Sequence, residues 1–518
     1  MRKLLWAAAA LCAGCGTNSA TGGGTVQVIL DIPNAALDPK GYSSVELRLH
    51  GDSGDLERNV PVFNGMFDLG DLQTMHNVTV DAVLRTDTGE AVGYGRSSTP
   101  MDVVAGAMLT VPVRRPIVYF AGLVSNDPDN NPQTNNTHWT EVPATFGDMS
   151  NGTTFDGTTT LSGPTVLMVS AGPALFEVQQ ATSDPDGALM GNGTIVPVST
   201  GDHSLSPPMS GTLQGAVLDG AGTDDGKILV IGTSQHLYVV NVMTGAAMPV
   251  ADGEFDRVAL VTSSDGQLSA LAIKNRASTT ASCASTAELV WVTINGDETA
   301  NVTSLGTGGW ADVAGDRGHA YYVDQCKGEL GEVTMAGVTA KRMQLGRATM
   351  LAVSGQQAWI GVEKPGRPAQ VALVSASIGG SDPPRTLYSV PAVQVVEAID
   401  DPGVQRSMDA DTAVFNQLEV GAGGDYVATT TSAHYAGAAI PDANFPQMEI
   451  VADELRIVDA ASGAAVQRYR SWCDGTITIR SINEITNWRC ATETGQSAPS
   501  SPSLEHKLSS MTFTFGKK

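Results

Sequence analysis

The stretch 453–469, DELRIVDAASGAAVQRY, decides how the rest of the chain is interpreted. Apolar Leu455 and Ile457 stand on either side of Arg456, which is the period of two that an extended strand requires. Gly463 then allows the turn conformation that other L-residues resist, and a second short strand follows. We therefore predict a β-hairpin over this stretch.

Hairpins of the same design recur upstream. Each joins a β-rich run to a second short run through a turn of small residues, and they occupy residues 236–250, 288–305, 329–345 and 370–390. A second pattern places a small polar turn directly before an apolar strand, with turn glycines at Gly226, Gly266, Gly318, Gly355 and Gly424. Their spacings fit a repeat of about 40–45 residues per unit, with an insertion before the last glycine. The sequence thus predicts a repeat architecture made of strands.

These turns resemble the Asp-Gly turn between the first two strands of a β-propeller blade in WD40-like and YVTN-like repeats. The resemblance covers about 210–470, and without a Gly-His or Trp-Asp signature pair it names no specific family. It implies a propeller of about seven blades over 116–518, with six or eight also compatible with this length. Blade one is expected to combine 117–122 with 165–198. The alternating run 509–517 is expected to close the ring by pairing with Ile117–Phe120; a stray edge strand is the alternative.

The N-terminus has the form of an export signal. Arg2 and Lys3 precede the apolar run 4–11, which is too short to span a bilayer. The next residues, LCAGC at 11–15, resemble the lipobox of bacterial lipoproteins, which implies cleavage after Gly14 and lipid attachment at Cys15. An ordinary secretory signal is the alternative. In the enterobacterial sorting pattern, a residue other than Asp after the anchor cysteine implies the outer membrane, so the expected location is the cell envelope, lipid-anchored.

The domain prediction follows from these signals and from composition. Charged residues make up only 16% of the chain and glycines number 57, which indicates an all-β protein with many turns. We expect a signal peptide at 1–14, a flexible tether at 15–24, a β-sandwich at 25–115 and a β-propeller at 116–518. The short strands of 25–115 are similar in pattern to Ig-like or transthyretin-like modules.

The chain is strongly acidic. It has 30 Lys and Arg against 54 Asp and Glu, a net charge of −24. Such a chain is repelled by nucleic acid and by anionic lipid head groups, so neither is an expected electrostatic ligand. The remaining interpretations are a solubilising surface or a cationic partner.

The cysteines outside the signal number four and suggest disulfides, because an exported protein meets an oxidising environment. Proximity in the sequence favours the pairs Cys283–Cys326 and Cys473–Cys490, although other pairings are possible. Zinc binding is the alternative, but no His stands at ligand spacing beside either pair.

Candidate site residues are few. Known catalytic motifs such as GxSxG, HExxH and the P-loop are missing from the sequence. Asp127, Asp129 and Asn131 have the alternating spacing that lets oxygen ligands face one cation, so calcium is possible, with a plain solvated loop as the alternative. His434 follows a predicted strand in the unit with the insertion, where propeller sites are often built.

The function that these features favour is non-enzymatic binding or scaffolding. We expect the propeller face to present loops to an envelope protein or a glycan, with the membrane contacted through the lipid anchor. The alternative is a metal-dependent propeller hydrolase or lactonase-like enzyme, which would need several oxygen or His ligands pointing into one axial pocket.

Overall fold

The computed structural model describes residues 27–32, 41–51, 54–61, 75–97, 101–104, 107–124, 136–143, 153–157, 165–180, 191–199, 205–263, 266–276, 287–295, 299–398, 405–437, 449–470, 477–480, 485–490, 508–513 and 515–516. Their regular elements are strands, apart from one short 3-10 helix, η2 (Ala422–Gly424). The prediction of an all-β protein is confirmed. A search of the described residues found no helix with the length and apolar character needed to cross a membrane.

The N-terminal sheet contains seven hydrogen-bonded strands in the order β1-β7-β5-β4-β2-β3, with β6 paired to β4. The strands are β1 (Gln27–Asp31), β2 (Ser44–Gly51), β3 (Gly54–Pro61), β4 (Met75–Arg85), β5 (Ala91–Arg96), β6 (Met101–Val103) and β7 (Met108–Arg114). Alternating apolar residues such as Leu47, Val80 and Val111 form its core. These strands form one hydrogen-bonded set, so the Ig-like or transthyretin-like sandwich stays a prediction.

Among the residues that the structure describes, six four-stranded sheets form propeller blades. The strands of the first three are β8 (Ile117–Val124), β9 (Asn136–Pro143), β10 (Thr153–Gly157) and β38 (Leu508–Phe513); β11 (Thr165–Ala171), β12 (Ala174–Gln179), β13 (Gly193–Val198) and β14 (Thr212–Leu213); β15 (Val217–Gly222), β16 (Ile228–Thr233), β17 (His236–Asn241) and β18 (Ala247–Asp252). The strands of the next three are β19 (Phe255–Thr262), β20 (Leu268–Lys274), β21 (Ala287–Ile294) and β22 (Ala300–Gly308); β23 (Trp310–Asp316), β24 (His319–Asp324), β25 (Glu329–Thr334) and β26 (Gly337–Arg342); β27 (Arg347–Ser354), β28 (Gln357–Lys364), β29 (Gln370–Ser377) and β30 (Arg385–Val390).

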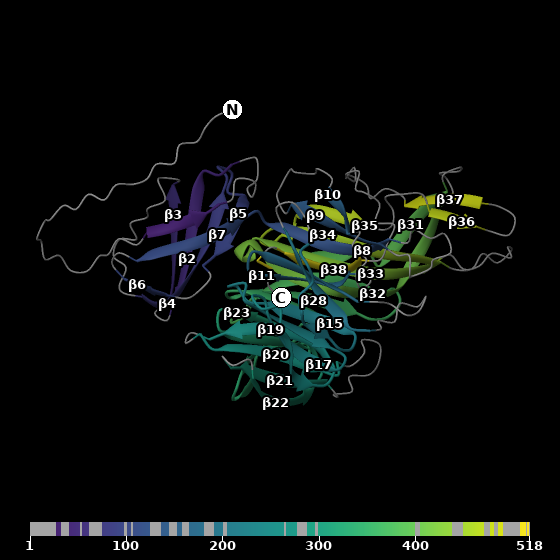
Figure 1. The fold of residues 1–518 in the computed structure, drawn as a ribbon. Helices are drawn as coiled ribbons and strands as arrows, with labels where there is room; N and C mark the ends of the chain where they lie inside the picture. Colours follow the sequence, from purple (N-terminus) through teal and green to yellow (C-terminus); the bar gives the residue numbers. More distant parts are fainter. Residues whose placement is uncertain are drawn as a thin grey trace, which may run out of the picture.

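A larger sheet fills the ring between β27 and β38 (Figure 1). Its seven strands are β31 (Val393–Ala398), β32 (Gln405–Gly421), β33 (Tyr426–Gly437), β34 (Glu449–Asp459), β35 (Ala465–Arg470), β36 (Ile477–Arg480) and β37 (Ile485–Cys490). The prediction of about seven blades is therefore corrected to six four-stranded blades. The physical reason is β32, whose 17 residues pair with β33 and also extend far enough to pair with β31.

The last strand closes the ring as predicted. β38 pairs with β8, matching Met511 with Phe120 and Phe513 with Val118. Both Met511 and Phe513 are fully buried, so this closure contributes apolar burial as well as backbone hydrogen bonds. The expected composition of blade one is wrong, however. Residues 165–198 belong to a separate sheet, because β8 finds its partners in β9 and β38.

The two repeating patterns occupy recurring places in the fold. The hairpins predicted in the four-stranded sheets are their third and fourth strands, as in β17–β18, whereas 453–469 forms β34–β35 at one edge of the larger sheet. Four of the turn glycines lie between the first and second strands of a four-stranded sheet, and Gly424 lies between β32 and β33 of the larger sheet. All five have positive φ, which explains why glycine is used there. The long spacing before Gly424 is accounted for by β31 and the length of β32.

Neighbouring first strands are held together by side chains as well as by packing. The Asp219 carboxylate on β15 accepts the N–H of Val258 on β19 at 2.8 Å, and Asp312 on β23 accepts the N–H of Leu351 on β27 at 2.9 Å. The strands also approach closely, because a Cβ at Gly222 would stand 2.2 Å from the carbonyl oxygen of Ser170. At these two places a backbone donor of one first strand is thus satisfied by an acidic side chain of a neighbouring first strand.

Candidate functional site at the junction of the N-terminal sheet and the propeller

The N-terminal sheet docks on the turns that join the first and second strands of several blades. Arg96 at the end of β5 and Asp81 on β4 are register partners and form a bidentate ion pair of 2.5 and 2.9 Å. Both side chains are buried. A planar guanidinium matches a carboxylate in this two-bond arrangement, so the pair has a fixed orientation. It presents the outer nitrogen of Arg96 to the propeller.

The propeller completes this charge network with residues of two turns. Arg96 Nη1 lies 2.9 Å from Asp224 Oδ2 in the β15–β16 turn and 3.6 Å from Asp316 Oδ1 at the end of β23. Arg317, which follows Asp316 with a positive φ of 49°, donates from Nη2 to Asp81 Oδ2 at 3.1 Å. The network therefore alternates acid and base across the junction, and each charge has an opposite partner.

The network perturbs the protonation of Asp81. Burial by itself raises the pKa of Asp81, but Arg96, His50 and Arg317 together outweigh burial and hold the pKa well below its usual value. Burial likewise lowers the pKa of Arg96, and the charge of Asp81 more than reverses this, so the pKa of Arg96 lies well above its usual value. Both groups are therefore charged near neutral pH.

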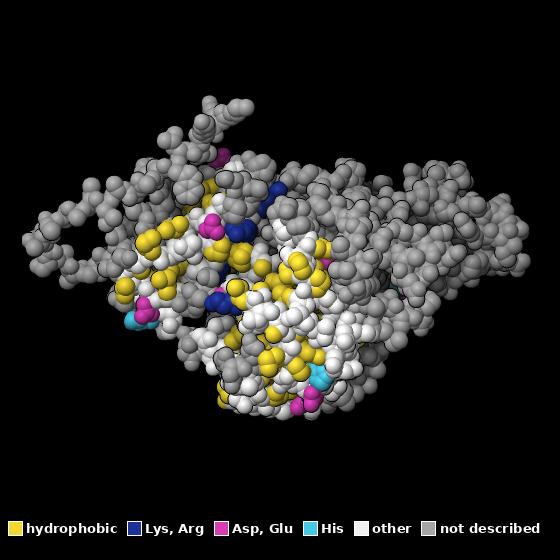
Figure 2. All heavy atoms as spheres, viewed as in Figure 1, with side chains coloured by type: hydrophobic (Ala, Val, Ile, Leu, Met, Phe, Trp, Pro, Cys, Tyr) yellow, Lys and Arg dark blue, Asp and Glu magenta, His cyan; other side chains and the backbone are white. Residues whose placement is uncertain are grey.

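A second polar contact lies at the larger sheet. Arg85 at the end of β4 is 3.1 Å from Asp425 Oδ1, beside η2, and also pairs with Glu46 on β2. Arg48 donates to the carbonyl oxygen of Gly423 at 2.8 Å. Figure 2 shows Lys and Arg side chains along the boundary between the two parts of the molecule.

Apolar contacts join the same two parts. Val83 and Tyr94 of the N-terminal sheet belong to one core with Phe513 and Phe515 near the C-terminus. The rings of Tyr94 and Phe515 meet edge to face with centroids 5.7 Å apart. The hydroxyl of Tyr426 also donates to the carbonyl of Ala91 at 2.9 Å. The junction is thus packed and hydrogen-bonded, which fixes the sheet on the propeller.

A cavity of about 570 Å³ lies beside the charge network. It is bounded by the N-terminal sheet and by first strands and turns of the propeller, and its size is within the range of ordinary ligand pockets. The hydroxyl side chains that line it include Thr79, Ser97, Ser170, Thr223, Thr262 and Thr512. The rest of the lining is mostly apolar, with residues such as Leu260 and Leu268, so the cavity combines apolar surface with neutral hydrogen-bonding groups.

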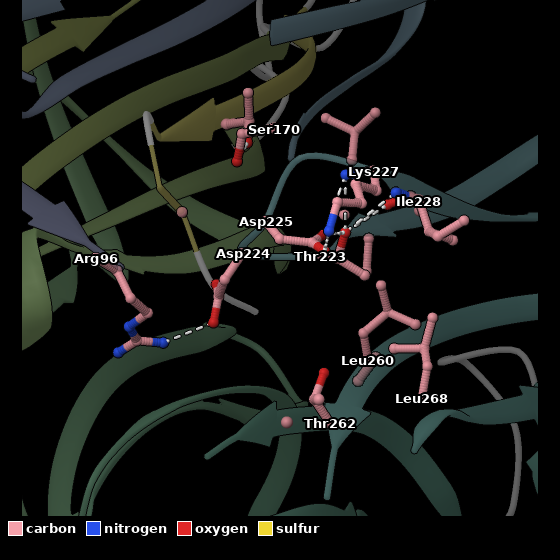
Figure 3. Close-up of a pocket in the computed structure, with 18 of the residues that line it drawn as sticks. Arg96, Ser170, Thr223, Asp224, Asp225, Lys227, Ile228, Leu260, Thr262 and Leu268 are labelled. Atoms are coloured by element: carbon pink, nitrogen blue, oxygen red, sulfur yellow. Dashed lines mark hydrogen bonds and ion pairs between the residues drawn. The ribbon is translucent and has the colours of Figure 1, made fainter. Parts of the chain in front are cut away.

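The β15–β16 turn forms one side of this cavity (Figure 3). Thr223 Oγ1 donates to Asp225 Oδ1 at 2.7 Å, and Lys227 Nζ lies 2.9 Å from Asp225 Oδ2. Asp225 is therefore used within its own turn, whereas its neighbour Asp224 points toward Arg96. The two adjacent carboxylates have different roles: one shapes the turn and the other holds the N-terminal sheet.

Most sequence-predicted site residues lie outside the described residues. These are Cys15, Cys283, Cys473, Asp127, Asp129 and Asn131, together with the side chain of Cys490 on β37. Cys326 lies in the turn after β24, where its N–H donates to Asp324 Oδ1 at 2.8 Å. The two disulfide pairs and the calcium loop therefore stay predictions. Within the described part of the chain, no group of three or more His, Cys, Asp and Glu side chains has metal-site geometry.

The structure places His434 away from the cavity. It lies on β33, and its Nδ1 is 3.6 Å from Asp411 Oδ2 on β32. Asp411 is also 3.1 Å from Arg367 Nε. His434 thus lies in a charged cluster of the larger sheet and is absent from the residues that line the cavity.

Sequence reasoning missed the residues that build the junction. Asp81 lies in the apolar run NVTVDAVLR and Arg96 ends the run AVGYGR. A charged residue inside an apolar strand pattern is costly to bury unless it is paired. The positions of Asp81 and Arg96 in apolar strands could therefore have indicated that each has a charged partner. Nothing in the sequence shows that Asp224 and Arg317, more than 100 positions away, supply the partners.

Together the sheet topology and the junction define a β-propeller that carries an N-terminal sheet over one face. No protein-family model matches the chain, and no curated protein matches it either. Among solved structures, a periplasmic gluconolactonase of Pseudomonas aeruginosa is similar at 14% identity, covering 68% of this chain and 95% of that one with a TM-score of 0.34.

Two further solved structures have a comparable likeness. The WD40 repeats of RRP9 are 12% identical over 53% of this chain and 76% of that one, with a TM-score of 0.33. A chain of a nidogen–laminin complex is 10% identical over 53% of this chain and 92% of that one, also with a TM-score of 0.33. Identities this low concern the fold alone, and nothing further rests on them.

Proposed function

We propose that this chain is a non-enzymatic binding module of a bacterial cell envelope, anchored by lipid at Cys15, that takes a glycan in the cavity between its two parts. The observation that supports the proposal is the fixed junction: Arg96 and Arg317 tie Asp81 to the propeller, and a cavity of about 570 Å³ lies beside them. A preformed cavity lowers the ordering cost of binding. Hydroxyl groups and apolar surface line the same cavity, which supports a glycan as the ligand.

Glycan binding is tested by filling the cavity. Thr262 lies on its wall, so Thr262→Trp should occlude it, whereas Thr303→Trp adds the same side chain to the exposed outer strand β22. We expect short oligosaccharides of neutral hexose and N-acetylhexosamine units to bind saturably to the wild type and to Thr303→Trp. Affinity should fall at least tenfold in Thr262→Trp. Equal binding by both variants, or no binding to the wild type, would overturn the glycan proposal.

The lipid anchor is tested separately. Cells expressing the chain are fed an alkyne-tagged fatty acid, and the protein is isolated and examined for label. We expect label on the wild type and none on Cys15→Ser, because the thioether requires that sulfur. Cys12→Ser is the matched control and should retain the label. Label that persists in Cys15→Ser would reject the anchor.

Metal analysis separates binding from the metal-dependent alternative. The full chain is incubated with calcium, desalted, and examined by elemental mass spectrometry and by thermal melts with and without chelator. We expect no stoichiometric metal and an unchanged melting temperature. A bound metal whose removal lowers the melting temperature would instead direct attention to Asp127, Asp129 and Asn131.

A further inference from the structure

Three arginines come together at the end of the central channel that lies away from the N-terminal sheet. Arg257 is near the start of β19, Arg276 follows the end of β20, and Arg347 begins β27. The N-terminal sheet docks at the other ends of these first strands, through turn residues such as Arg317. We call Arg257, Arg276 and Arg347 the arginine cluster.

The cluster reaches across the ring. Arg276 Nη2 donates to the carbonyl oxygen of Thr349 on β27 at 3.2 Å, although β23 separates β19 from β27 in the ring. Arg257 Nε lies 3.5 Å from Asp312 Oδ1 on β23. The arginine side chains therefore approach the channel from two sheets, β19–β22 and β27–β30, on either side of β23.

The cluster contains hydrogen-bond donors that the protein does not use. The Nε atoms of Arg257, Arg276 and Arg347 are all buried and lack an acceptor among the described residues. A buried donor without an acceptor costs free energy, and a guanidinium is a strong donor with fixed geometry. Three such donors at one place indicate a missing acceptor.

The nearby carboxylates Asp312 and Glu363 lie within ion-pair range of Arg257 and Arg347, but their shorter contacts are hydrogen bonds from backbone and hydroxyl groups. Asp312 accepts the N–H groups of Val313 at 3.0 Å and Leu351 at 2.9 Å. Glu363 accepts the hydroxyl of Thr349 at 3.0 Å, and its other oxygen is 4.0 Å from Arg347 Nε.

The electrostatics agree with the geometry. Burial and the neighbouring positive charge of Arg257 lower the pKa of Arg276 to about 10. The carboxylates Asp312, Glu363 and Asp256 act in the opposite direction and offset only part of this shift. A bound anion would relieve both effects, because it would offset the like charges and accept the free N–H groups.

We propose that the arginine cluster binds a small oxyanion, in the form of a phosphate or carboxylate group, at the channel mouth opposite the N-terminal sheet. Guanidinium forks match both groups in planar two-bond contacts. The ligand would be free in solution or the charged end of a larger molecule. This site is separate from the cavity at the junction, so the oxyanion proposal can be tested independently of the glycan proposal.

Calorimetric titration of the full chain with inorganic phosphate, at an ionic strength held constant with NaCl, tests the site. We expect saturable binding and at least a tenfold loss of affinity in both Arg276→Gln and Arg347→Gln. Arg58→Gln removes an equal charge from the exposed face of β3 and should bind as the wild type does. A parallel titration with acetate distinguishes the two ligand groups: whichever anion binds more tightly identifies the preferred one.

Thermal melts provide a second measurement. Phosphate stabilises most proteins by exclusion from their surface, so a rise shared by all variants is not binding. We expect an additional saturable rise in the wild type and Arg58→Gln that both cluster variants lack. If neither anion binds the wild type, or if folded Arg347→Gln binds as tightly as the wild type, the proposal is wrong.

Discussion

Replacing Asp81 with Asn should loosen the N-terminal sheet on the propeller. The Asp81 carboxylate is fully buried and pairs with both Arg96 and Arg317. Asp81→Asn keeps the shape but leaves the two guanidinium groups short of one negative charge. Removing one partner of a buried ion pair costs about 3–5 kcal/mol. Because Arg96 keeps its contact with Asp224, we expect the lower end, about 3 kcal/mol.

Hydrogen exchange followed by mass spectrometry measures this loss where it occurs. Peptides that cover β4 and β5 report the free energy of local opening. A loss of about 3 kcal/mol corresponds to roughly hundredfold faster exchange when opening and closing equilibrate faster than the open amides exchange. Asp102→Asn is the matched control, because Asp102 is exposed and pairs only with His76 among described charged side chains. That variant should exchange at the wild-type rate.

The stability lost in Asp81→Asn should also depend on pH in a defined direction. The folded-state pKa of Asp81 is depressed, so its stabilisation is fully present above the unfolded value of about 3.9. It is lost as pH falls from there through the folded pKa. The difference between wild type and Asp81→Asn should therefore be constant near neutrality and narrow below about pH 4. A difference under about 1 kcal/mol at pH 7, or one that stays unchanged in acid, would refute the reasoning.

Two further stability changes follow from the ring. Phe513→Ala removes a fully buried ring from the closing strand, and it should cost about 3–5 kcal/mol of stability, measured as a lower melting temperature. Exposed Met343→Ala is the control and should have no effect. If Phe513→Ala melts at the same temperature as the wild type, closure of the ring by β38 is contradicted. Asp219→Ala leaves the Val258 N–H without its acceptor and should cost about 1–3 kcal/mol in urea unfolding, while exposed Asp252→Ala should not. If the two Asp variants unfold alike, the carboxylate does not support the ring.

Local sequence patterns predicted individual strands and turns well. They predicted less well which strands belong to the same sheet. Hairpins such as 453–469 and turn glycines such as Gly226 were found because strand period and positive φ depend on neighbouring residues. Which strand joins which sheet depends on pairing across distant segments. That is why 165–198 was assigned to the wrong blade and why the extension of β32 was unforeseen.

The candidate site shows the same division. The sequence contains Asp81 and Arg96 in apolar strands and the Asp224-Asp225 turn, but it gives no reason to connect them. Only docking of the sheet brings Arg96 within 2.9 Å of Asp224. The cavity beside this contact, like the arginine cluster, is lined from several elements and has no local pattern to reveal it.

By itself, the sequence determined the all-β class, the repeated hairpins and the closing role of the last strand, because each depends on alternation and turn chemistry within a few residues. The tertiary structure alone decided the blade membership, the larger sheet and the charged junction. These depend on contacts between residues far apart in the chain, and a side chain's partner is fixed only when the surfaces that carry both are packed together.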